Sequence, residues 1–254
     1  MIDLKKLKKN CLKKHISPMA CYKHPSLNLV FYPHQKCAST TYRLLFEKLE
    51  WIHICITDID WQQHKVFAHI KDPLVRHRKG IVEGICHYFP EVEDLFMTPV
   101  GSKFLTNITI VESHSYTIEK WLGEDNAVLV HWIPIDTNLD HVKETFNFLE
   151  KNGCPVDNSI KKWFENLPKQ NESTPNEIKL YNLLLSFETP GEILRYIDFD
   201  RCLYGLVLDH YHFEPKNYRA RVEQIKLAGF SELEAQHQAD SEVSTGQYLN
   251  WDTE

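Results

Sequence analysis

The residues best suited to chemistry follow a short apolar run near the N-terminus. Residues 29–32 are Leu, Val, Phe and Tyr, and Lys36 then precedes Cys37 and four small residues, Ala38, Ser39, Thr40 and Thr41. A strand that leads through a short loop into a helix gathers unpaired backbone N–H groups and the positive end of the helix dipole at one point. With a lysine beside them, these groups predict a binding site for a phosphate-like anion.

The loop also admits a simpler interpretation. It is not the nucleoside-triphosphate loop, because G-x-x-x-x-G-K-[ST] is absent and Lys36 precedes the small residues instead of following a glycine. An ordinary strand-to-helix turn, capped by Ser39 or Thr40 and carrying a solvated lysine, would have the same residues.

A second group of basic residues surrounds a predicted helix start. Asp72 and Pro73 supply a helix N-cap and a proline for the first helical position. Lys71 lies just before this start, while Arg76 and Lys79, three residues apart, are expected on one helical face. In an acidic chain this concentration of positive charge favours an anionic ligand. The alternative is a solvated basic face whose charges pair with nearby acidic residues, namely Glu83, Glu91 and Glu93.

The order of strands and helices explains how the two groups would meet. Apolar, β-branched runs predict strands at residues 27–32, 51–57, 65–70, 107–111 and 127–135. Helices are expected at 40–49, 72–87 and 138–151, with a helical turn at 116–122. This alternation predicts a parallel sheet covered on both faces, and ligands bind such sheets at the carboxyl ends of the strands. The loop after residue 32 and the corner at 70–72 are therefore expected to face one crevice.

The whole chain is expected to form one domain. Its 254 residues suit a single elaborated unit. We expect an α/β core at 27–152, a helical C-terminal extension at 153–239 with a linker near 170–175, and a polar tail at 240–254.

Composition excludes several classes of protein. The net charge is −6, which argues against a bulk nucleic-acid binder. No apolar run approaches the roughly 20 residues that span a bilayer, and no apolar segment follows the basic N-terminus as in a secretory signal. The seven cysteines show no framework spacing and indicate free thiols in a reducing compartment. A soluble cytoplasmic protein is expected.

Together and in this order, the two basic groups resemble the sulfotransferases that use 3′-phosphoadenosine-5′-phosphosulfate (PAPS). The likeness is closest to the carbohydrate-sulfotransferase branch and its small microbial and viral relatives. That family carries Pro-Lys-x-[Ala/Gly]-[Ser/Gly]-Thr-[Ser/Thr] after its first strand, which residues 36–41 match with Pro33 displaced by two positions. Its Arg-Asp-Pro-x-x-Arg-x-x-Ser segment is matched in frame from Lys71, in place of arginine, to Lys79, in place of serine. The resemblance covers residues 27–83.

The resemblance implies a fold, a reaction and a set of roles. The fold would be a three-layer α/β sandwich like that of the P-loop NTPases, with a parallel sheet and a helical C-terminal part. Lys36 would neutralise charge on the bridging oxygen as the sulfuryl group passes in line to an acceptor hydroxyl or amine. The N–H groups from Cys37 to Thr41, with the hydroxyls of Ser39, Thr40 and Thr41, would hold the 5′-phosphate. Lys71, Arg76 and Lys79 would hold the 3′-phosphate. Adenosine 3′,5′-bisphosphate (PAP) would leave as product, and no metal would be needed.

The resemblance also implies a base that takes the acceptor's proton, which is His or Glu in this family. His114 follows a predicted strand and is the first candidate; His53, His64 and Glu112 are its rivals. His114 also suits a capping or structural role.

A separate group near the N-terminus has metal-ligand residue types. Two cysteines and two histidines lie within fourteen residues, Cys11, His15, Cys21 and His24. Their spacing fits no common zinc finger, so surface residues of a leading segment are the simpler interpretation.

Two other functions stay open. One is a nucleotide kinase or another nucleoside-phosphate transferase, which the missing glycine-lysine loop disfavours. The other is a non-catalytic module that binds an anion. The acceptor would be a small molecule or a carbohydrate, and neither its identity nor the oligomeric state follows from the sequence.

Overall fold

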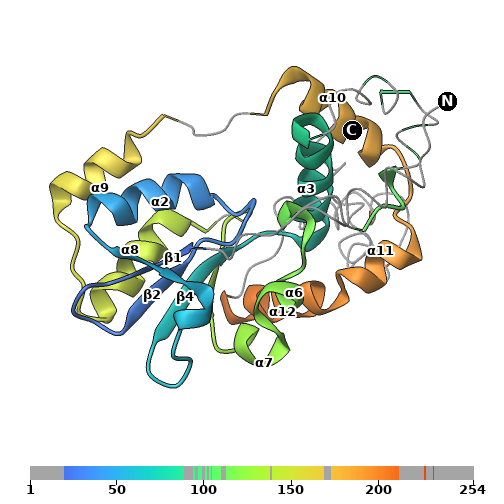
Figure 1. Cartoon of the computed structure of the whole chain (residues 1–254). Coiled ribbons are helices and arrows are strands. Elements are labelled where there is room, and N and C mark those ends of the chain that lie inside the picture. The colour runs from blue at the N-terminus through green and yellow to red at the C-terminus, as the bar shows by residue number, and fades with distance from the viewer. Residues whose placement is uncertain are drawn as a thin grey trace.

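A five-stranded mixed sheet lies at the centre of the fold, with helices on both of its faces (Figure 1). This computed structural model describes residues 20–88, 94, 97–98, 101, 103, 105–109, 113–137, 139–168, 173–211, 226 and 231. The sheet order is β3-β1-β2-β4-β5. The strands are β1 (Ala20–Lys23), β2 (Leu29–Tyr32), β3 (Ile52–Cys55), β4 (Lys65–Ile70) and β5 (His131–Pro134).

Half of the sheet is parallel. β4 pairs in parallel with β2, where Phe31 lies opposite Phe67, and with β5, where His69 lies opposite Ile133. These three strands therefore place their carboxyl ends, and the loops that follow them, at the same edge of the sheet.

The expectation of a wholly parallel sheet is wrong. β1, which the sequence did not predict, runs antiparallel to both β2 and β3. The connection from β1 to β2 spans only residues 24–28, and His24 N donates to Leu29 O across it at 3.0 Å. A parallel pairing needs a crossover of a dozen or more residues, so this short connection imposes the antiparallel arrangement.

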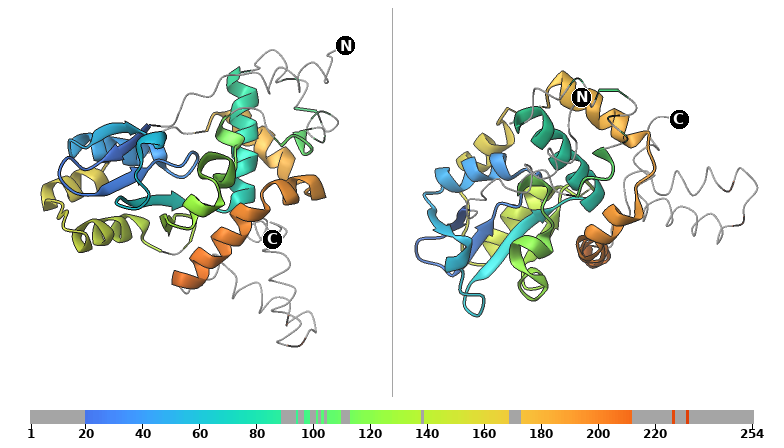
Figure 2. Two further views of the ribbon diagram at one scale, coloured as in Figure 1. Left: turned by 60° about the horizontal axis from the view of Figure 1, so that its bottom comes forward. Right: turned by 45° about the vertical axis from the view of Figure 1, so that its right-hand side comes forward.

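Alternate residues along the strands face two separate cores, which makes β2 apolar throughout. Val30 and Tyr32 face one core, whereas Leu29 and Phe31 face the other. Figures 1 and 2 show the helices that cover these faces. The first core is covered by α6 (Ile118–Leu122), α7 (Glu124–Ala127) and α12 (Asp198–Tyr211). The second is covered by α2 (Ser39–Lys48), α8 (His141–Lys151) and α9 (Asn158–Glu165).

α3 (Pro73–Tyr88) starts where β4 ends and carries a third, smaller core. Asp72 caps it by accepting a hydrogen bond from Val75 N at 2.8 Å, and Pro73 takes the first helical position. Its apolar face packs on α10 (Pro175–Leu185), its first turn meets α11 (Gly191–Tyr196), and the short helix η3 (Ser113–Ser115) lies against it. Another short helix, η1 (Ile56–Asp58), follows β3.

Most expected elements are confirmed, with shifted ends. The strand at 65–70 and the helix start at residue 73 agree with the structure, while the strand expected at 127–135 is shortened to β5 because α7 takes its first residue. The strand expected at 107–111 is wrong at 107–109, where Ile108 N donates to Leu105 O and closes a turn. Residues 110–111, residues 170–172 of the expected linker and the expected tail at 240–254 lie outside the described residues, and Thr174 and Pro175 of that linker begin α10. The single-domain division stays a prediction.

Across the part of the chain that the structure describes, no helix is both long and apolar enough to cross a membrane.

Candidate functional site

The loop between β2 and α2 has a strained backbone. Lys36 and Ala38 have φ angles of 64° and 56°, in the left-handed region where a side chain costs roughly 1–2 kcal/mol. Among the described non-glycine residues only Glu50 shares a positive φ. Strain of this kind persists where the surrounding structure fixes it, and it collects at binding sites. The strain therefore singles out this loop from the rest of the described chain.

The N-terminus of α2 has an unusual cap. The capping residue is Ala38, which makes no side-chain cap, so the interpretation of Ser39 or Thr40 as the cap is wrong. Ser39, Thr40 and Thr41 instead form the first helical turn, where their side chains are partly buried. The first N–H groups of an α-helix have no acceptor within the helix, and Ala38 offers them no side-chain oxygen. This end of α2 therefore suits an anion as acceptor.

Lys36 and α3 meet at a cavity of about 130 Å³. Lys36 Nζ forms an ion pair with Glu83 Oε2 of α3, and the two side chains are 23% and 29% exposed. Lys79, one turn before Glu83, lines the same cavity. The remaining lining residues come from α3 and from the start of α10: Val82, Ser173, Glu177, Ile178 and Tyr181. Lys36 of the first basic group and Lys79 of the second thus line one cavity, whereas Lys71 and Arg76 do not line it.

The ends of β4 and β5 are tied together beside this loop. Asp72 N donates to Asp136 Oδ2 at 2.7 Å, and Tyr204 OH donates to Asp136 Oδ1 at 2.8 Å. Burial raises the pKa of Asp136. Lys71 lies at this corner and is partly buried. Its positive charge opposes the effect of burial by acting to lower the pKa values of both Asp136 and Cys37. The corner and the loop between β2 and α2 are therefore neighbours.

Cys37 is part of the loop but is not a reactive thiol. Its side chain is buried, and burial raises the pKa of the thiol to about 12. A neutral buried thiol is a poor nucleophile. The backbone N–H of Cys37, which was expected to hold a phosphate, donates instead to His34 O at 3.3 Å.

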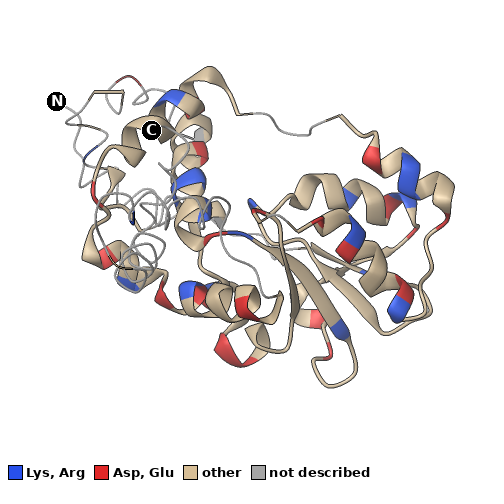
Figure 3. Cartoon of the chain, turned by 180° about the vertical axis from the view of Figure 1, so that it is seen from behind, with Lys and Arg blue, Asp and Glu red and all other residues tan. Residues whose placement is uncertain are grey.

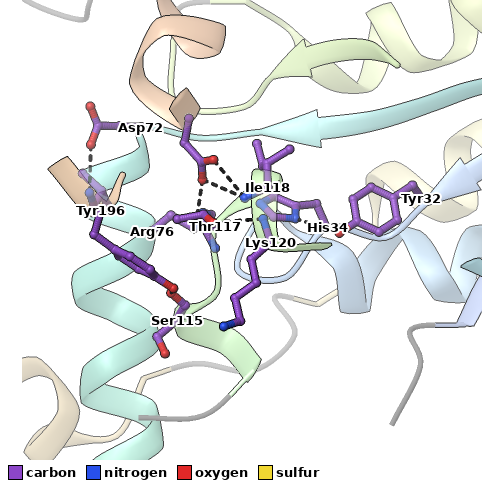
Figure 4. Close-up of polar contacts among 11 residues, drawn as sticks. Tyr32, His34, Asp72, Arg76, Ser115, Thr117, Ile118, Lys120 and Tyr196 are labelled. Carbon is purple, nitrogen blue, oxygen red and sulfur yellow. Dashed lines mark hydrogen bonds and ion pairs between the residues drawn. The ribbon is translucent and has the colours of Figure 1, made fainter. Parts of the chain in front are cut away.

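Arg76 lies inside the protein and joins three helices (Figure 4). Its Nη2 donates to Asp200 Oδ2 of α12 at 3.1 Å, and both side chains are at most 1% exposed. The carboxylate of Asp200 also accepts from Ile118 N, at the start of α6, at 2.9 and 3.0 Å. The expectation that Arg76 and Lys79 share one helical face is wrong, because Arg76 points into this junction whereas Lys79 lines the cavity.

His34 lies near Arg76 and is also buried. Its Nδ1 lies 3.3 Å from Tyr32 OH, while its Nε2 and the Nε and Nη1 of Arg76 have no hydrogen-bond partner. Burial, with the nearby Arg76 charge, holds the pKa of His34 well below its usual value. The imidazole is therefore neutral beside a permanent positive charge.

The basic residues of α3, whose ribbon positions are blue in Figure 3, contact different partners. Arg78 donates to Thr189 Oγ1 at 2.6 Å, and Lys79 Nζ lies 5.6 Å from the centre of the Tyr181 ring. Of the three basic residues from Arg76 to Lys79, only Lys79 lines the cavity.

None of the described base candidates lines this cavity. His114 belongs to η3, whose backbone contacts α3 at Gly80. His53 is an exposed residue of β3, 4.0 Å from Glu47, and His64 Nδ1 accepts from Asp60 N at 3.0 Å. Glu112 lies outside the described residues.

Of the two cysteines and two histidines near the N-terminus, which were interpreted as surface residues, the structure describes Cys21 and His24, and that interpretation is wrong for Cys21. Cys21 is a buried core residue, and His24 Nδ1 accepts from Leu27 N at 3.0 Å. Cys11 and His15 lie outside the described residues. Among the residues that are described, no three His, Cys, Asp or Glu side chains are grouped to hold a metal ion, and the described cysteines form no disulfide.

Sequence reasoning missed the acidic and aromatic side of the cavity. Glu83 was considered only as a partner of the basic face, although its place four residues after Lys79 put it on the same side of α3. Nothing local in the sequence of α10 indicates that Glu177 and Tyr181 would line the cavity beside Lys36.

Comparison with protein-family models, with curated proteins and with solved structures finds no match to this chain.

Proposed function

We propose that this chain transfers a sulfuryl group from PAPS to an acceptor hydroxyl or amine, on a three-layer fold like that of the P-loop NTPases. One observation carries the proposal: Lys36, in a strained loop at an uncapped helix N-terminus, and Lys79, of the second basic segment, line one cavity. The family that the two motifs resemble needs these two segments at one ligand. The described cysteines form no disulfide, which supports a reducing compartment such as the cytoplasm.

The residues around the loop suit the charges of this reaction. The bond between sulfur and the bridging oxygen breaks as sulfur bonds to the acceptor oxygen or nitrogen, PAP leaves with the electron pair, and the proton of the acceptor passes to solvent. Lys36 would stabilise the charge on the bridging oxygen, and the first N–H groups of α2 would hold the 5′-phosphate. Lys71 and Lys79 would bind the 3′-phosphate. Arg76 would act through the junction that it forms with Asp200 and α6, since it is buried away from the cavity.

The size of the cavity limits what it holds. Pockets for whole drug-sized ligands measure about 300–1,000 Å³, whereas this cavity measures about 130 Å³. We therefore assign it only the charged groups of the donor that Lys36 and Lys79 would bind, and not the adenosine.

Binding and transfer of the donor test the proposal. PAP should stabilise the protein against heat at micromolar concentrations, and ATP with magnesium should do so less well. With radiolabelled PAPS and a metabolite extract, Lys36→Ala should lower sulfate transfer by about 100-fold or more while leaving the melting temperature unchanged. Lys79→Ala should mainly weaken PAP binding. The control is Lys143→Ala, an exposed lysine on α8. A preference for ATP with magnesium, or near-normal transfer by Lys36→Ala, would show that the loop is wrongly assigned.

One observation favours a second candidate, a non-catalytic module that binds an anion. Lys36 is already neutralised by Glu83, and no described base candidate reaches the cavity. Such a module would bind PAP without consuming PAPS. Mass spectrometry of the mixture distinguishes the two, because only a transferase produces a sulfated acceptor.

A further inference from the structure

The lysine of the proposed anion site is held by a carboxylate of the chain itself. Lys36 Nζ contacts Glu83 Oε2, and both side chains line the same cavity. The ammonium group of Lys36 is needed by two partners. One is the carboxylate of Glu83, and the other is any anion that binds Lys36. The two therefore compete for this group.

Glu83 is well placed to exchange partners. It lies on α3, a helix of sixteen residues, so its backbone is fixed. Lys79 lies four residues earlier on the same helix, at the spacing at which side chains of opposite charge meet. It also lines the cavity. A Glu83 side chain that releases Lys36 thus still lies beside a positive charge.

The other acidic residue of the cavity has a different role. Glu177 Oε2 accepts from Thr174 N at 2.6 Å, and Thr174 Oγ1 accepts from Glu177 N at 3.2 Å. These bonds form the capping box at the start of α10. Glu177 is thereby fixed to its own helix, and Glu83 is the carboxylate that competes for Lys36.

We propose that Glu83 is a built-in competitor of the anionic ligand, and that binding proceeds by exchange of Lys36 from Glu83 to the ligand. The identity of the ligand rests on the proposed function, but the exchange applies to any anion that binds Lys36. The apparent dissociation constant of such a ligand is its intrinsic value divided by the fraction of protein in which Lys36 is available. A carboxylate that occupies Lys36 nine-tenths of the time weakens binding about tenfold by this relation.

Calorimetric titration of the full chain with PAP, and separately with inorganic pyrophosphate, tests the exchange. Glu83→Gln keeps the shape of the side chain and removes its charge. This variant should bind each probe roughly three- to tenfold more tightly than the unmodified protein. The matched control is Glu144→Gln on α8, away from the cavity, which should change neither affinity. Glu83→Ala serves as a second variant if Glu83→Gln does not fold.

A variant that lacks Lys36 distinguishes the exchange from a general loss of repulsion between Glu83 and the anion. In Lys36→Met the substitution Glu83→Gln has no ammonium group to release. Its gain in affinity should therefore disappear, and the two substitutions should be non-additive. An equal gain with and without Lys36 would overturn the exchange.

The outcomes for the exchange and for the proposed function are distinct. If the unmodified protein binds PAP and Glu83→Gln binds it no more tightly, the exchange is wrong and the proposed function stands. If Glu83→Gln tightens binding of pyrophosphate while neither protein binds PAP, the exchange stands and the function is wrong. Failure of both proteins to bind either probe would overturn both.

Discussion

At the scale of single residues, the described site is organised around charges that the chain itself neutralises. Lys36 pairs with Glu83 at the cavity, and Arg76 pairs with Asp200 in the interior. The two pairs differ in exposure, and their expected effects on stability differ accordingly. A partly exposed pair contributes roughly 0–1 kcal/mol, whereas breaking a buried pair leaves an uncompensated charge.

We expect Asp200→Asn to destabilise the fold by about 3–5 kcal/mol, because it leaves the Arg76 guanidinium buried without a counter-charge. Urea unfolding at neutral pH measures the change. The control is Asp198→Asn on the same helix, since that carboxylate is 68% exposed and lies 3.9 Å from Arg201. It should change stability by less than about 0.5 kcal/mol. Equal effects of the two substitutions would show that the buried pair does not hold the three helices together.

At the scale of elements, the packing of α3 against η3 depends on a glycine. A Cβ placed on Gly80 would lie 2.4 Å from the carbonyl oxygen of His114 and 3.0 Å from Ser115 N. These are backbone atoms, which cannot move aside without shifting η3 itself. η3 leads through Thr117 into α6, whose first N–H groups bind Asp200. Gly80 thus permits the approach that completes the Arg76 junction.

Gly80→Ala should therefore destabilise the protein, by about 1–3 kcal/mol, although alanine favours helices over glycine by about 1 kcal/mol. Gly205 lies within α12 and provides the opposite case, because its Cβ would contact nothing within 4 Å. We expect Gly205→Ala to stabilise the fold by up to about 1 kcal/mol. Thermal unfolding of both variants tests the pair. A stabilising Gly80→Ala would contradict the close approach of η3.

At the scale of the whole molecule, three buried histidines lie where the sheet meets the loop and α3. His34 belongs to the loop, His69 to β4 and His77 to α3, and each is at most 2% exposed. His69 stacks on Tyr42, with ring centres 3.8 Å apart, and its Nε2 lies 2.9 Å from Thr145 Oγ1. Burial lowers the pKa of all three, to about 4 for His77. The folded state therefore holds them neutral.

This neutrality makes stability depend on pH. Between its ordinary pKa near 6.5 and the folded pKa of about 4, His77 takes up a proton in the unfolded chain but not in the folded one. Stability is therefore lost as pH falls through this range, by about 2 kcal/mol from pH 7 to pH 5 for His77 alone. Asp136 and Asp200 act in the opposite direction, because burial raises their pKa values. The folded protein takes up these two protons more readily than the unfolded chain, which adds stability as the pH falls.

Urea unfolding at pH 7 and pH 5 measures this dependence. His77→Gln should make the loss of stability smaller, whereas His53→Gln, at an exposed histidine, should leave it unchanged. A loss that is the same in His77→Gln and the unmodified protein would show that His77 does not bind its proton differently on unfolding.

The sequence by itself determined the local elements around the candidate site. The apolar run at 65–70 predicted β4, and Asp72-Pro73 predicted the start of α3. These predictions were correct because short apolar runs and helix capping act over a few neighbouring residues. The order of these elements also predicted that the loop after β2 and the start of α3 would meet.

Only the tertiary structure decided which charges face the cavity and which are buried. Arg76 and Lys79 look alike in sequence, yet Arg76 meets Asp200, 124 residues further along the chain, whereas Lys79 lines the cavity. The antiparallel β1 and the pairing of Lys36 with Glu83 were decided in the same way. Such pairings depend on how distant segments are brought together in space, and local residue preferences do not contain that information.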